Sequence, residues 1–485
     1  RMRITPAELA NDVSSSSRPS PRLILTATMA VMAGGFHFGF QMAILNPMAE
    51  VLQSFLMTAF ERRYHMPVSE SFQRIVWSSL AASLFIGAAI GAWIGASLTN
   101  RKGAATTVIV AAFILGVSIP LSGFAYLITS CELFVLSRLV TGFGIGIGTT
   151  AQGVFLAEIS PVEHRGFISS FGGFGTNIGF ILASFLGLPD ILGQATRWHL
   201  AYFIAGSPCI IVLFYFILFA HESPVHLVRK GKDDRAFKSA VAYSNETIAS
   251  TRIEEIKLEL SRTSTVSTMK DILMDRVSRR VLLLSTTLNA TVSFSGIIAM
   301  SFFGTFLLSQ LGFSDRSAAL SNCLSSLAGT AGAITATLAV DKVGRRLLVI
   351  GSLLLLALIN TLMMVLELLY ETTNWMGLGH AFLLIFIAFL FIFSAGAGPA
   401  AWFIGAELST QETRARVQAA SIGAQYVTCF LSPIIYFPLQ RFVGAYSFLL
   451  FIIPLSASSV FFYNCLPETR GKNSEEIHSE MRRSL

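Results

Sequence analysis

The stretch Glu158-Ile-Ser-Pro-Val-Glu-His-Arg165 returns later in the chain as Glu407-Leu-Ser-Thr-Gln-Glu-Thr-Arg414, with the same spacing between its glutamate and its arginine. Two further stretches recur at nearly the same distance along the chain. They are Asn100-Arg-Lys-Gly103, which returns as Asp341-Lys-Val-Gly344, and Glu222-Ser-Pro224, which returns as Glu468-Thr469. Three recurrences in one order indicate that the chain consists of two similar halves.

The composition indicates that these halves lie in a membrane. Of the 485 residues, 53% are hydrophobic and only 13% are charged, whereas soluble domains carry about 25% charged residues. A soluble protein of this length could not bury so much apolar surface, and disordered chains are poor in apolar residues. We therefore expect a multispanning membrane protein. The net charge of +7 is interpreted as a sign of membrane topology and not of nucleic acid binding.

Apolar runs of the roughly 20 residues that a helix needs to cross a bilayer occur about twelve times. We expect membrane helices at 23–46, 76–98, 105–128, 132–157, 166–189, 199–220, 280–308, 315–340, 346–367, 378–404, 414–439 and 443–466. Six of them precede a long polar stretch and six follow it. The prediction is an all-α membrane protein with two six-helix bundles related by pseudo-two-fold symmetry. This parallel repeat is the layout of major facilitator transporters, which bind substrate between the halves near the bilayer midplane.

The distribution of basic residues gives the expected topology and domains. Most of the 35 Lys and Arg fall on inside segments when the N-terminus is placed inside, and such residues favour the cytoplasmic side. Both termini are therefore expected in the cytoplasm. The polar central segment is interpreted either as a linker or as a cytoplasmic clamp. The expected domains are an N-terminal tail 1–22, a bundle 23–220, a cytoplasmic segment of amphipathic helices 221–278, a bundle 279–466 and a C-terminal tail 467–485.

The recurring charged residues all fall at the cytoplasmic ends of the expected helices. Arginine presents a planar fork of donors that matches a carboxylate, so ion pairs between the halves could hold the cytoplasmic side closed. The alternative is that these arginines only anchor the helices on the inside of the membrane. The proposed latch residues are Arg101, Glu158, Arg165, Glu222, Arg345, Arg346, Glu407, Arg414 and Glu468.

The sequence offers little for proton coupling, metal binding or catalysis. We find no Asp or Glu near the middle of an expected span, and the nearest titratable candidate is the lone His37. Proton coupling needs an ionisable group in the pathway, so uncoupled transport is favoured. The five cysteines are scattered singly, without the paired spacing of metal or redox sites. We predict no metal, no cofactor and no catalytic residues, and the protein is not expected to be an enzyme.

Several stretches spread along the chain are those of a known family: Gly35-Phe-His-Phe-Gly-Phe-Gln41 with Asn46, Arg138-Leu-Val-Thr-Gly142, Glu158 to Gly166, Glu222-Ser-Pro224, Asp341-Lys-Val-Gly-Arg-Arg346, Gly396-Ala-Gly-Pro-Ala-Ala-Trp-Phe403 and Pro467-Glu-Thr-Arg-Gly471. In these stretches the chain resembles the sugar-porter family, and specifically the animal facilitative glucose transporters. The resemblance implies alternating access by rocking of the two bundles and, by analogy, a place in the plasma membrane. It covers nearly the whole chain.

The polar ring that binds sugar hydroxyls in hexose-transporting relatives is largely replaced here. The positions that depart from it are Gly173, Val292, Ser293, Ile298, Phe302, Phe303, Gly329, Ser394, Gln425 and Tyr426, while Trp402 is kept. Losing about four amides, each worth about 1 kcal/mol, would weaken hexose binding about a thousandfold. The expected substrate contacts are Trp402, Gln425, Tyr426, Ser293, Ser295, Asn177, Gln41 and His37, with Phe302 and Phe303 as outer-gate residues.

A second departure lies in the first half. The family's Gly-Arg-Arg is here Gly103-Ala104-Ala105, so the latch of that half is expected to be weaker and inward-open states more populated. Together these features predict a facilitative uniporter of a sugar or a related small solute, in contact with the lipid bilayer. The alternatives are a carrier of a non-sugar solute and a non-transporting sensor on the same scaffold. The oligomeric state is left open.

Overall fold

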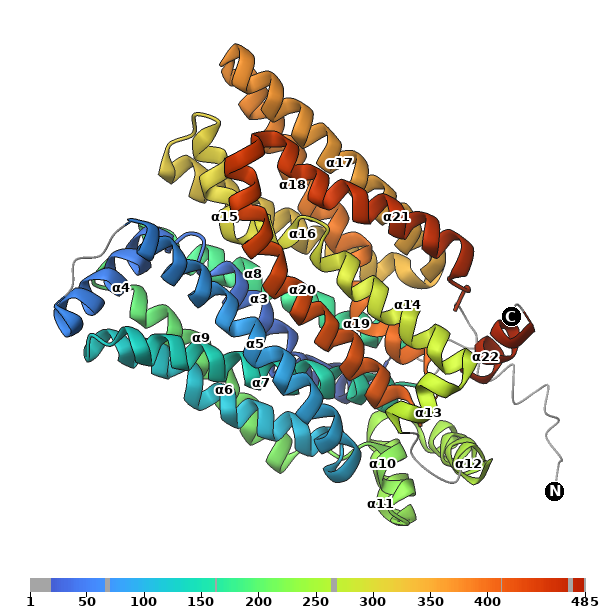
Figure 1. Cartoon of the computed structure of the whole chain (residues 1–485). Helices are drawn as coiled ribbons and strands as arrows, with labels where there is room; N and C mark the ends of the chain where they lie inside the picture. The colour runs from blue at the N-terminus through green and yellow to red at the C-terminus, as the bar shows by residue number, and fades with distance from the viewer. Residues whose placement is uncertain are drawn as a thin grey trace, which may run out of the picture.

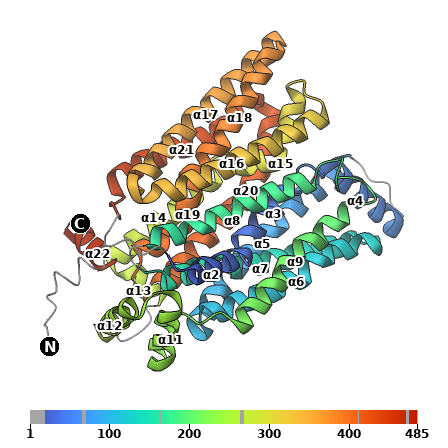
Figure 2. The same ribbon diagram turned by 180° about the vertical axis from the view of Figure 1, so that it is seen from behind.

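The computed structural model describes residues 19–65, 70–161, 164–262, 268–410, 412–469 and 474–483, all of which form helices and the turns between them. Most of the expected N-terminal tail, residues 1–18, lies outside the described residues. Two helical bundles lie side by side along their length (Figures 1 and 2). The first contains α2 to α9 and the second contains α14 to α21.

The N-terminal bundle begins with a bent span made of α2 and α3. Its helices are α2 (Pro21–Met32), α3 (Gly35–Ala43), α4 (Ala49–Tyr64), α5 (Glu70–Lys102), α6 (Ala104–Leu127), α7 (Cys131–Ile159), α8 (Arg165–Leu186) and α9 (Trp198–Leu218). Helix α4 is not among the expected elements, because its sequence is too polar for a membrane span.

The C-terminal bundle repeats this order. Its helices are α14 (Arg276–Ser293), α15 (Ile297–Gln310), α16 (Asp315–Val343), α17 (Arg345–Thr373), α18 (Met376–Ala395), α19 (Ala397–Leu408), α20 (Arg414–Val443) and α21 (Leu449–Cys465), with the 3-10 turn η2 (Gly444–Phe448) before α21. Two spans are again split, into α14 with α15 and α18 with α19.

The described helices confirm the expected twelve spans. Nine stretches of them are long and apolar enough to cross a membrane, or ten when α2 and α3 count as one bent span. The last stretch, Arg414–Cys465, contains both α20 and α21. Helix α16, 29 residues long, packs against α18 and α8 and completes the set.

Glycines in α7 explain how the first bundle packs so closely. A Cβ atom on Gly142 would collide with the carbonyl oxygen of Leu84 in α5, and one on Gly146 with that of Ala88. Small residues let membrane helices approach backbone to backbone. The glycine-rich stretch of α7 is therefore a packing surface, as its place inside an apolar span suggests.

Four short helices connect the bundles at one end of the molecule, which we call the linker end. They are α10 (Pro224–Arg229), α11 (Asp233–Tyr243), α12 (Glu246–Arg262) and α13 (Met269–Met274). The C-terminal helix α22 (Ser474–Arg483) lies at the same end (Figure 1). It buries Ile477 and Met481, and His478 Nε2 lies 2.9 Å from the carbonyl oxygen of Leu408 in α19.

The two bundles meet along a long interface. Helix α5 packs against α20, and α8 packs against α16. Helices α3, α7 and α8 of the first half also contact α15, α19 and α20 of the second. Residues of α3, α15 and α19, the parts of the split spans that lie in this interface, form much of the pocket described next.

Candidate functional site

Each split span places backbone groups without helical partners inside the membrane, where such groups are costly. At two of these breaks, side chains form hydrogen bonds with the backbone groups. The backbone N–H of Gly35, at the start of α3, donates to Gln152 Oε1 of α7 at 2.8 Å. The amide of Asn360 in α17 donates to the carbonyl oxygen of Ser295 at 3.0 Å, where Gly296 adopts a φ of +99°. The breaks are therefore supported features of the fold.

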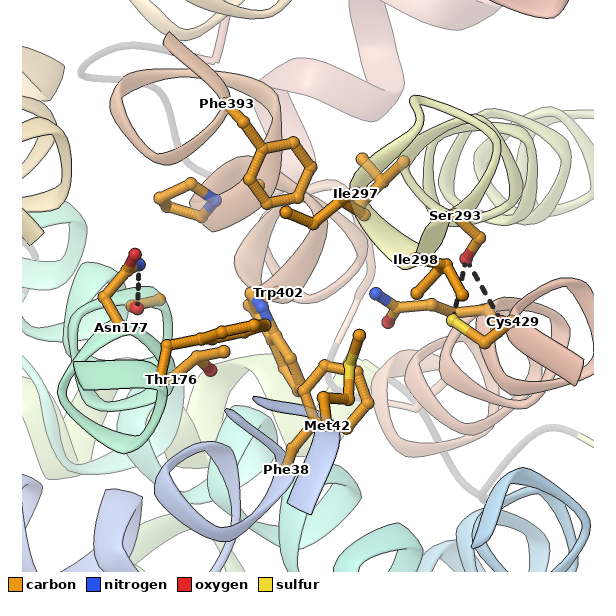
Figure 3. A pocket seen from close by; sticks show the side chains of 16 residues that line it. Phe38, Met42, Thr176, Asn177, Ser293, Ile297, Ile298, Phe393, Trp402 and Cys429 are labelled. Atoms are coloured by element: carbon orange, nitrogen blue, oxygen red, sulfur yellow. Dashed lines mark hydrogen bonds between the residues drawn. The ribbon is translucent and has the colours of Figure 1, made fainter. Parts of the chain in front are cut away.

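A pocket lies between the two halves, beside these breaks (Figure 3). Its free volume in this state is only about 30 Å³, well below the roughly 300–1,000 Å³ of typical small-molecule sites, so the pocket is nearly closed. Helices α3 and α8 supply its lining from the first half, and α14, α15, α18, α19 and α20 supply it from the second. The lining residues are Phe38, Met42, Gly173, Thr176, Asn177, Phe180, Val292, Ser293, Ile297, Ile298, Phe393, Gly398, Pro399, Trp402, Gln425 and Cys429.

Four of the eight expected substrate contacts line this pocket: Asn177, Ser293, Trp402 and Gln425. Asn177 bridges the halves, because its Oδ1 accepts a hydrogen bond from Ser394 Oγ at 2.8 Å, while its Nδ2 donates to Gly173 O. The hydroxyl of Ser293 lies 3.1 Å from the backbone oxygen of Gln425 and 3.2 Å from Cys429 Sγ. Both side chains already have partners inside the protein.

Gln425 and Trp402 differ from the other polar residues of the lining. Gln425 is 4% exposed, and its Oε1 has no hydrogen-bond partner among the described residues. Trp402 is 6% exposed. Their polar groups are therefore available to a bound molecule, and leaving a buried polar group unsatisfied costs about 1–3 kcal/mol.

The other four expected contacts lie outside the lining. His37 is fully buried in the first bundle, with Nε2 3.0 Å from Cys209 Sγ of α9. Gln41 accepts a hydrogen bond from the buried Arg138 at 3.1 Å. Ser295 donates to Val292 O of its own segment, and Tyr426 is hydrogen-bonded to Thr149 at 2.8 Å.

Aromatic and aliphatic side chains make up most of the pocket wall, and no sequence pattern indicated their role. Phe38 packs edge-on against Trp402, with ring centroids 5.6 Å apart. Ile297, Ile298 and Phe393 enter from the second half (Figure 3). An apolar residue in an apolar span looks the same in sequence whether it faces lipid, a neighbouring helix or a pocket.

Contacts between the halves lie on both sides of the pocket. Towards the linker end, Tyr426 of α20 bonds Thr149 of α7. Helices α3 and α15 run away from that end, and beyond the pocket Thr305 Oγ1 donates to Asn46 Oδ1 at 2.7 Å. The expected gate residue Phe302 packs edge-on against Phe85 of α5, with centroids 6.1 Å apart.

The described ring contact of Phe303, the second expected gate residue, is with a residue of its own C-terminal bundle. Its ring centroid lies 6.2 Å from that of Tyr436 in α20. Phe302 and Phe303 are neighbours in sequence, so they point to different sides of α15. Phe302 meets the opposite half through its ring contact with Phe85.

Glu222 caps helix α6 within the first half. Its carboxylate accepts hydrogen bonds from the backbone N–H groups of Ala105 and Thr106 at 2.9 and 3.1 Å. A Cβ atom on Gly103, where φ is +100°, would collide with this carboxylate. The next residue, Ser223, donates through its hydroxyl to Glu158 Oε2 at 2.5 Å.

Glu468 caps helix α17 of the second half in the same way. It accepts from the N–H groups of Arg345 and Arg346 at 3.0 and 3.2 Å. Gly344 has a φ of +93°, and Thr469 donates to Glu407 Oε2 at 3.1 Å. Here an arginine joins the cluster, because Arg345 Nε lies 3.7 Å from Glu407 Oε2.

The remaining proposed latch residues have different surroundings in the two halves. Arg346 donates to Tyr463 O at 2.6 Å within its own half. Arg414 donates to Ala406 O at 3.0 Å and also interacts electrostatically with Glu158 across the interface. Arg101 is exposed at the end of α5. Arg165 begins α8, and its side chain lies outside the described atoms.

Comparison with known proteins agrees with this architecture. A family model described as "Sugar (and other) transporter" matches residues 26–481. The chain is 28% identical over 460 residues to facilitated glucose transporter member 3 of Ovis aries, covering 94% of this chain and 92% of that protein. It is 26% identical over 469 residues to member 1 of Gallus gallus, with 96% and 94% covered.

Solved structures share the fold. The proton:xylose symporter XylE bound to 6-bromo-6-deoxy-D-glucose superposes with a TM-score of 0.80 at 22% identity, covering 94% of this chain and 99% of that one. The inward open conformation of XylE from E. coli gives 0.71 at 21% identity, with the same coverage. The chain has the major facilitator fold and belongs to the Sugar (and other) transporter family.

Proposed function

We propose that the protein is a facilitative carrier that moves a sugar or a related small neutral solute across a membrane by alternating access. The observation that carries this proposal is the pocket between the halves, to which Asn177 contributes from one half and Trp402 and Gln425 from the other. A solute bound there touches both bundles, so rocking of the bundles exposes it to one side and then to the other. The names of the relatives support a sugar-like substrate.

The contacts on the two sides of the pocket are proposed to act as gates. The pair Thr305–Asn46 and the ring contact Phe302–Phe85 would open together for entry from the end opposite the linker. The bond between Tyr426 and Thr149 would break for release towards the linker end. Each contact joins one half to the other, so neither set can persist when its side is open.

Uncoupled transport is the favoured mechanism. The pocket lining, all of it within the described residues, contains no Asp, Glu, Lys, Arg or His. The buried Arg138 is hydrogen-bonded to the neutral side chain and backbone of Gln41. His37 lies inside the first bundle against Cys209. Coupling to protons needs a titratable group that substrate binding can reach, and these positions do not supply one.

The linker end is proposed to face the cytoplasm, with both termini on that side of the plasma membrane. This orientation follows from the excess of basic residues in the segments at that end. Single cysteines at the exposed positions Ser250 in α12 and Ser54 in α4 test it in intact cells. A membrane-impermeant thiol reagent should label Ser54→Cys and spare Ser250→Cys until the cells are permeabilised, and the reverse pattern contradicts the orientation.

The test of function is counterflow of labelled sugars in proteoliposomes that contain the purified protein, with and without a pH gradient. We expect saturable exchange that the gradient leaves unchanged. Gln425→Leu should abolish it, because the variant removes the free amide of the pocket. The matched control is Thr428→Val, one turn away on α20, whose hydroxyl bonds only its own helix in the described structure.

The outcomes separate the competing functions. Exchange that is driven by the gradient contradicts uniport and supports symport. Saturable binding by folded protein without any exchange supports the sensor alternative. Exchange of a non-sugar solute, without exchange of any sugar tested, supports a carrier of a non-sugar solute. Each result is read only for protein that elutes as a single species and unfolds cooperatively.

A further inference from the structure

The pocket offers few free hydrogen-bonding groups to a bound molecule. Thr176 Oγ1 donates to Gly172 O at 3.0 Å, and Asn177 uses one donor and one acceptor inside the protein. The hydroxyl of Ser293 lies within hydrogen-bond distance of the backbone oxygens of Asn289 and Gln425 and of Cys429 Sγ. Among the described residues, the side-chain amide of Gln425 and the indole N–H of Trp402 have no hydrogen-bond partner.

The free amide of Gln425 determines what kind of group it recognises. A glutamine amide donates two hydrogen bonds and accepts at its oxygen. It is therefore complementary to a pair of adjacent groups, one donor and one acceptor, such as two vicinal hydroxyls. Because the side chain is 4% exposed and lines the pocket, a ligand is the natural partner for both ends of the amide.

The rest of the wall favours an apolar surface. Phe38, Ile297, Ile298 and Phe393 face the same space (Figure 3), and none of these side chains can hydrogen-bond. A hydroxyl group held against them loses its bonds to water and gains none from the protein. An unsubstituted hexose presents hydroxyls around nearly its whole ring, so several would be left unmatched.

From this geometry we propose that the carrier selects a neutral ring with a single polar edge, namely a partly deoxygenated or O-alkylated sugar or cyclic polyol, over an unmodified hexose. The proposal rests on the carrier function proposed above and names its substrate class. The vicinal polar pair meets Gln425, the indole N–H of Trp402 contacts a neighbouring oxygen, and the apolar part of the ring packs against Ile297, Ile298 and Phe393.

Binding is measured first, without transport, by ligand-dependent thermal shift and calorimetry on the full-length protein in nanodiscs. The probes are D-glucose, 2-deoxy-D-glucose, 6-deoxy-D-glucose, 2,6-dideoxy-D-glucose and 3-O-methyl-D-glucose. We expect the best analogue to bind at least about tenfold tighter than glucose, which corresponds to about 1.4 kcal/mol. A best analogue less than about fivefold tighter than glucose, or no binding by any probe, overturns the proposal.

Variants of the wall test the cause of the preference. Ile298→Asn adds an amide to the apolar wall and should reduce the analogue-to-glucose affinity ratio at least about fivefold, while Ile298→Val should leave it unchanged. Val292→Asn makes the same change on α14, in case the first variant does not fold. A ratio that is unchanged in the folded asparagine variants contradicts the proposal.

Gln425→Leu separates the role of the amide from that of the wall. It should weaken every probe at least about tenfold, because each ligand is expected to use the amide for its polar edge. Equal affinities in Gln425→Leu and the control Thr428→Val contradict this role. Counterflow of the same probes then distinguishes the two proposals. If the probes bind in the expected order of affinity but none is exchanged, the proposed selectivity stands and the proposed carrier function is refuted. If glucose is exchanged as efficiently as every analogue, the selectivity is refuted and the carrier function is supported.

Discussion

The linker ends of the two halves contain the same carboxylate cap with different side chains around it. In the first half Glu222 caps α6 at Ala105 and Thr106, and in the second Glu468 caps α17 at Arg345 and Arg346. A hydroxyl beside each cap donates to a second glutamate. The backbone design is therefore duplicated, and the difference lies in which positive charges meet that second glutamate.

In the C-terminal half the positive charge comes from the same half. Arg345 is 7% exposed, and its Nε lies 3.7 Å from Glu407, which is itself largely buried. Counted from the glycine that precedes each helix, Gly103 or Gly344, the corresponding position in the N-terminal half is Ala104, which is 1% exposed and carries no charge. We call Arg345, Glu407 and Glu468 the C-terminal corner, and Ala104, Glu158 and Glu222 the N-terminal corner.

The N-terminal corner also interacts with other parts of the molecule. Among the described side chains, Arg229 of the linker helix α10 and Arg414 of the opposite half interact electrostatically with Glu158. Arg414 can stay near Glu158 only while the halves are close together at this end. Closure of the interface therefore contributes part of the positive charge near Glu158.

The largest expected effect comes from removing Arg345 from the C-terminal corner. Arg345→Ala leaves the carboxylate of Glu407 buried without this cation, and breaking a buried pair costs about 3 kcal/mol or more. The unfolding temperature of the purified protein should fall by several degrees, and by less in Arg345→Ala/Glu407→Gln, which also removes the stranded charge. An unchanged unfolding temperature in Arg345→Ala would show that the pair contributes nothing.

The two caps should respond equally. Glu222→Gln and Glu468→Gln each keep the shape but remove the negative charge that faces a helix N-terminus, which is worth about 1 kcal/mol. We expect the two variants to lower stability to within about 0.5 kcal/mol of each other, the usual accuracy of such comparisons. A much larger loss in one variant would mean that the caps are not equivalent.

Restoring the missing arginine should change the conformational balance. In Ala104→Arg the new side chain can pair with Glu158 inside its own half, as Arg345 does with Glu407. Glu158 then depends less on Arg414, so the halves should part more easily at this end and an inhibitor that enters from the linker side should bind about fivefold tighter, close to 1 kcal/mol. If the arginine instead strengthens the latch, as expected from the sequence, the same inhibitor should bind more weakly. Ala104→Leu has similar bulk without charge, and the same shift in that control would assign the effect to size.

The smallest effect is expected at the opposite end of the molecule. Arg316 and Asp190 form an ion pair between the halves at 3.0 Å, but their side chains are 73% and 68% exposed. Exposed pairs contribute between about 0 and 1 kcal/mol and are screened by salt. Arg316→Ala should therefore change counterflow rates less than twofold at physiological salt, and a larger change would give this pair a gating role.

The sequence was sufficient for the fold because its signals are periodic and strong. Apolar runs, the recurring corner motifs and the distribution of basic residues predicted twelve spans in two bundles, and the structure confirms this arrangement. The helix α4 was missed because residues 49–64 are mixed in polarity and show no clear apolar face. The expected span 76–98 is longer in the structure, since α5 starts at Glu70 and ends at Lys102.

The pocket was predicted only in its polar part. Asn177, Ser293, Trp402 and Gln425 stand out in apolar spans, and they line the pocket. His37 and Gln41 stand out equally, yet they lie against Cys209 and Arg138. A polar residue in a membrane helix needs a partner, and the sequence alone does not say whether that partner is substrate or protein. The positions of the apolar wall depend on helix rotation, which no local pattern records.

Among the described side chains, Glu158 interacts with Arg414 across the interface, whereas Arg345 of its own half lies beside Glu407. A double-mutant cycle of Glu158→Gln and Arg414→Gln on thermal stability, repeated in the Ala104→Arg background, measures this difference. We predict a coupling free energy of about 1 kcal/mol in the natural background and a clearly smaller one in the Ala104→Arg background. Additive effects of the two substitutions, or a coupling that Ala104→Arg leaves unchanged, would contradict it.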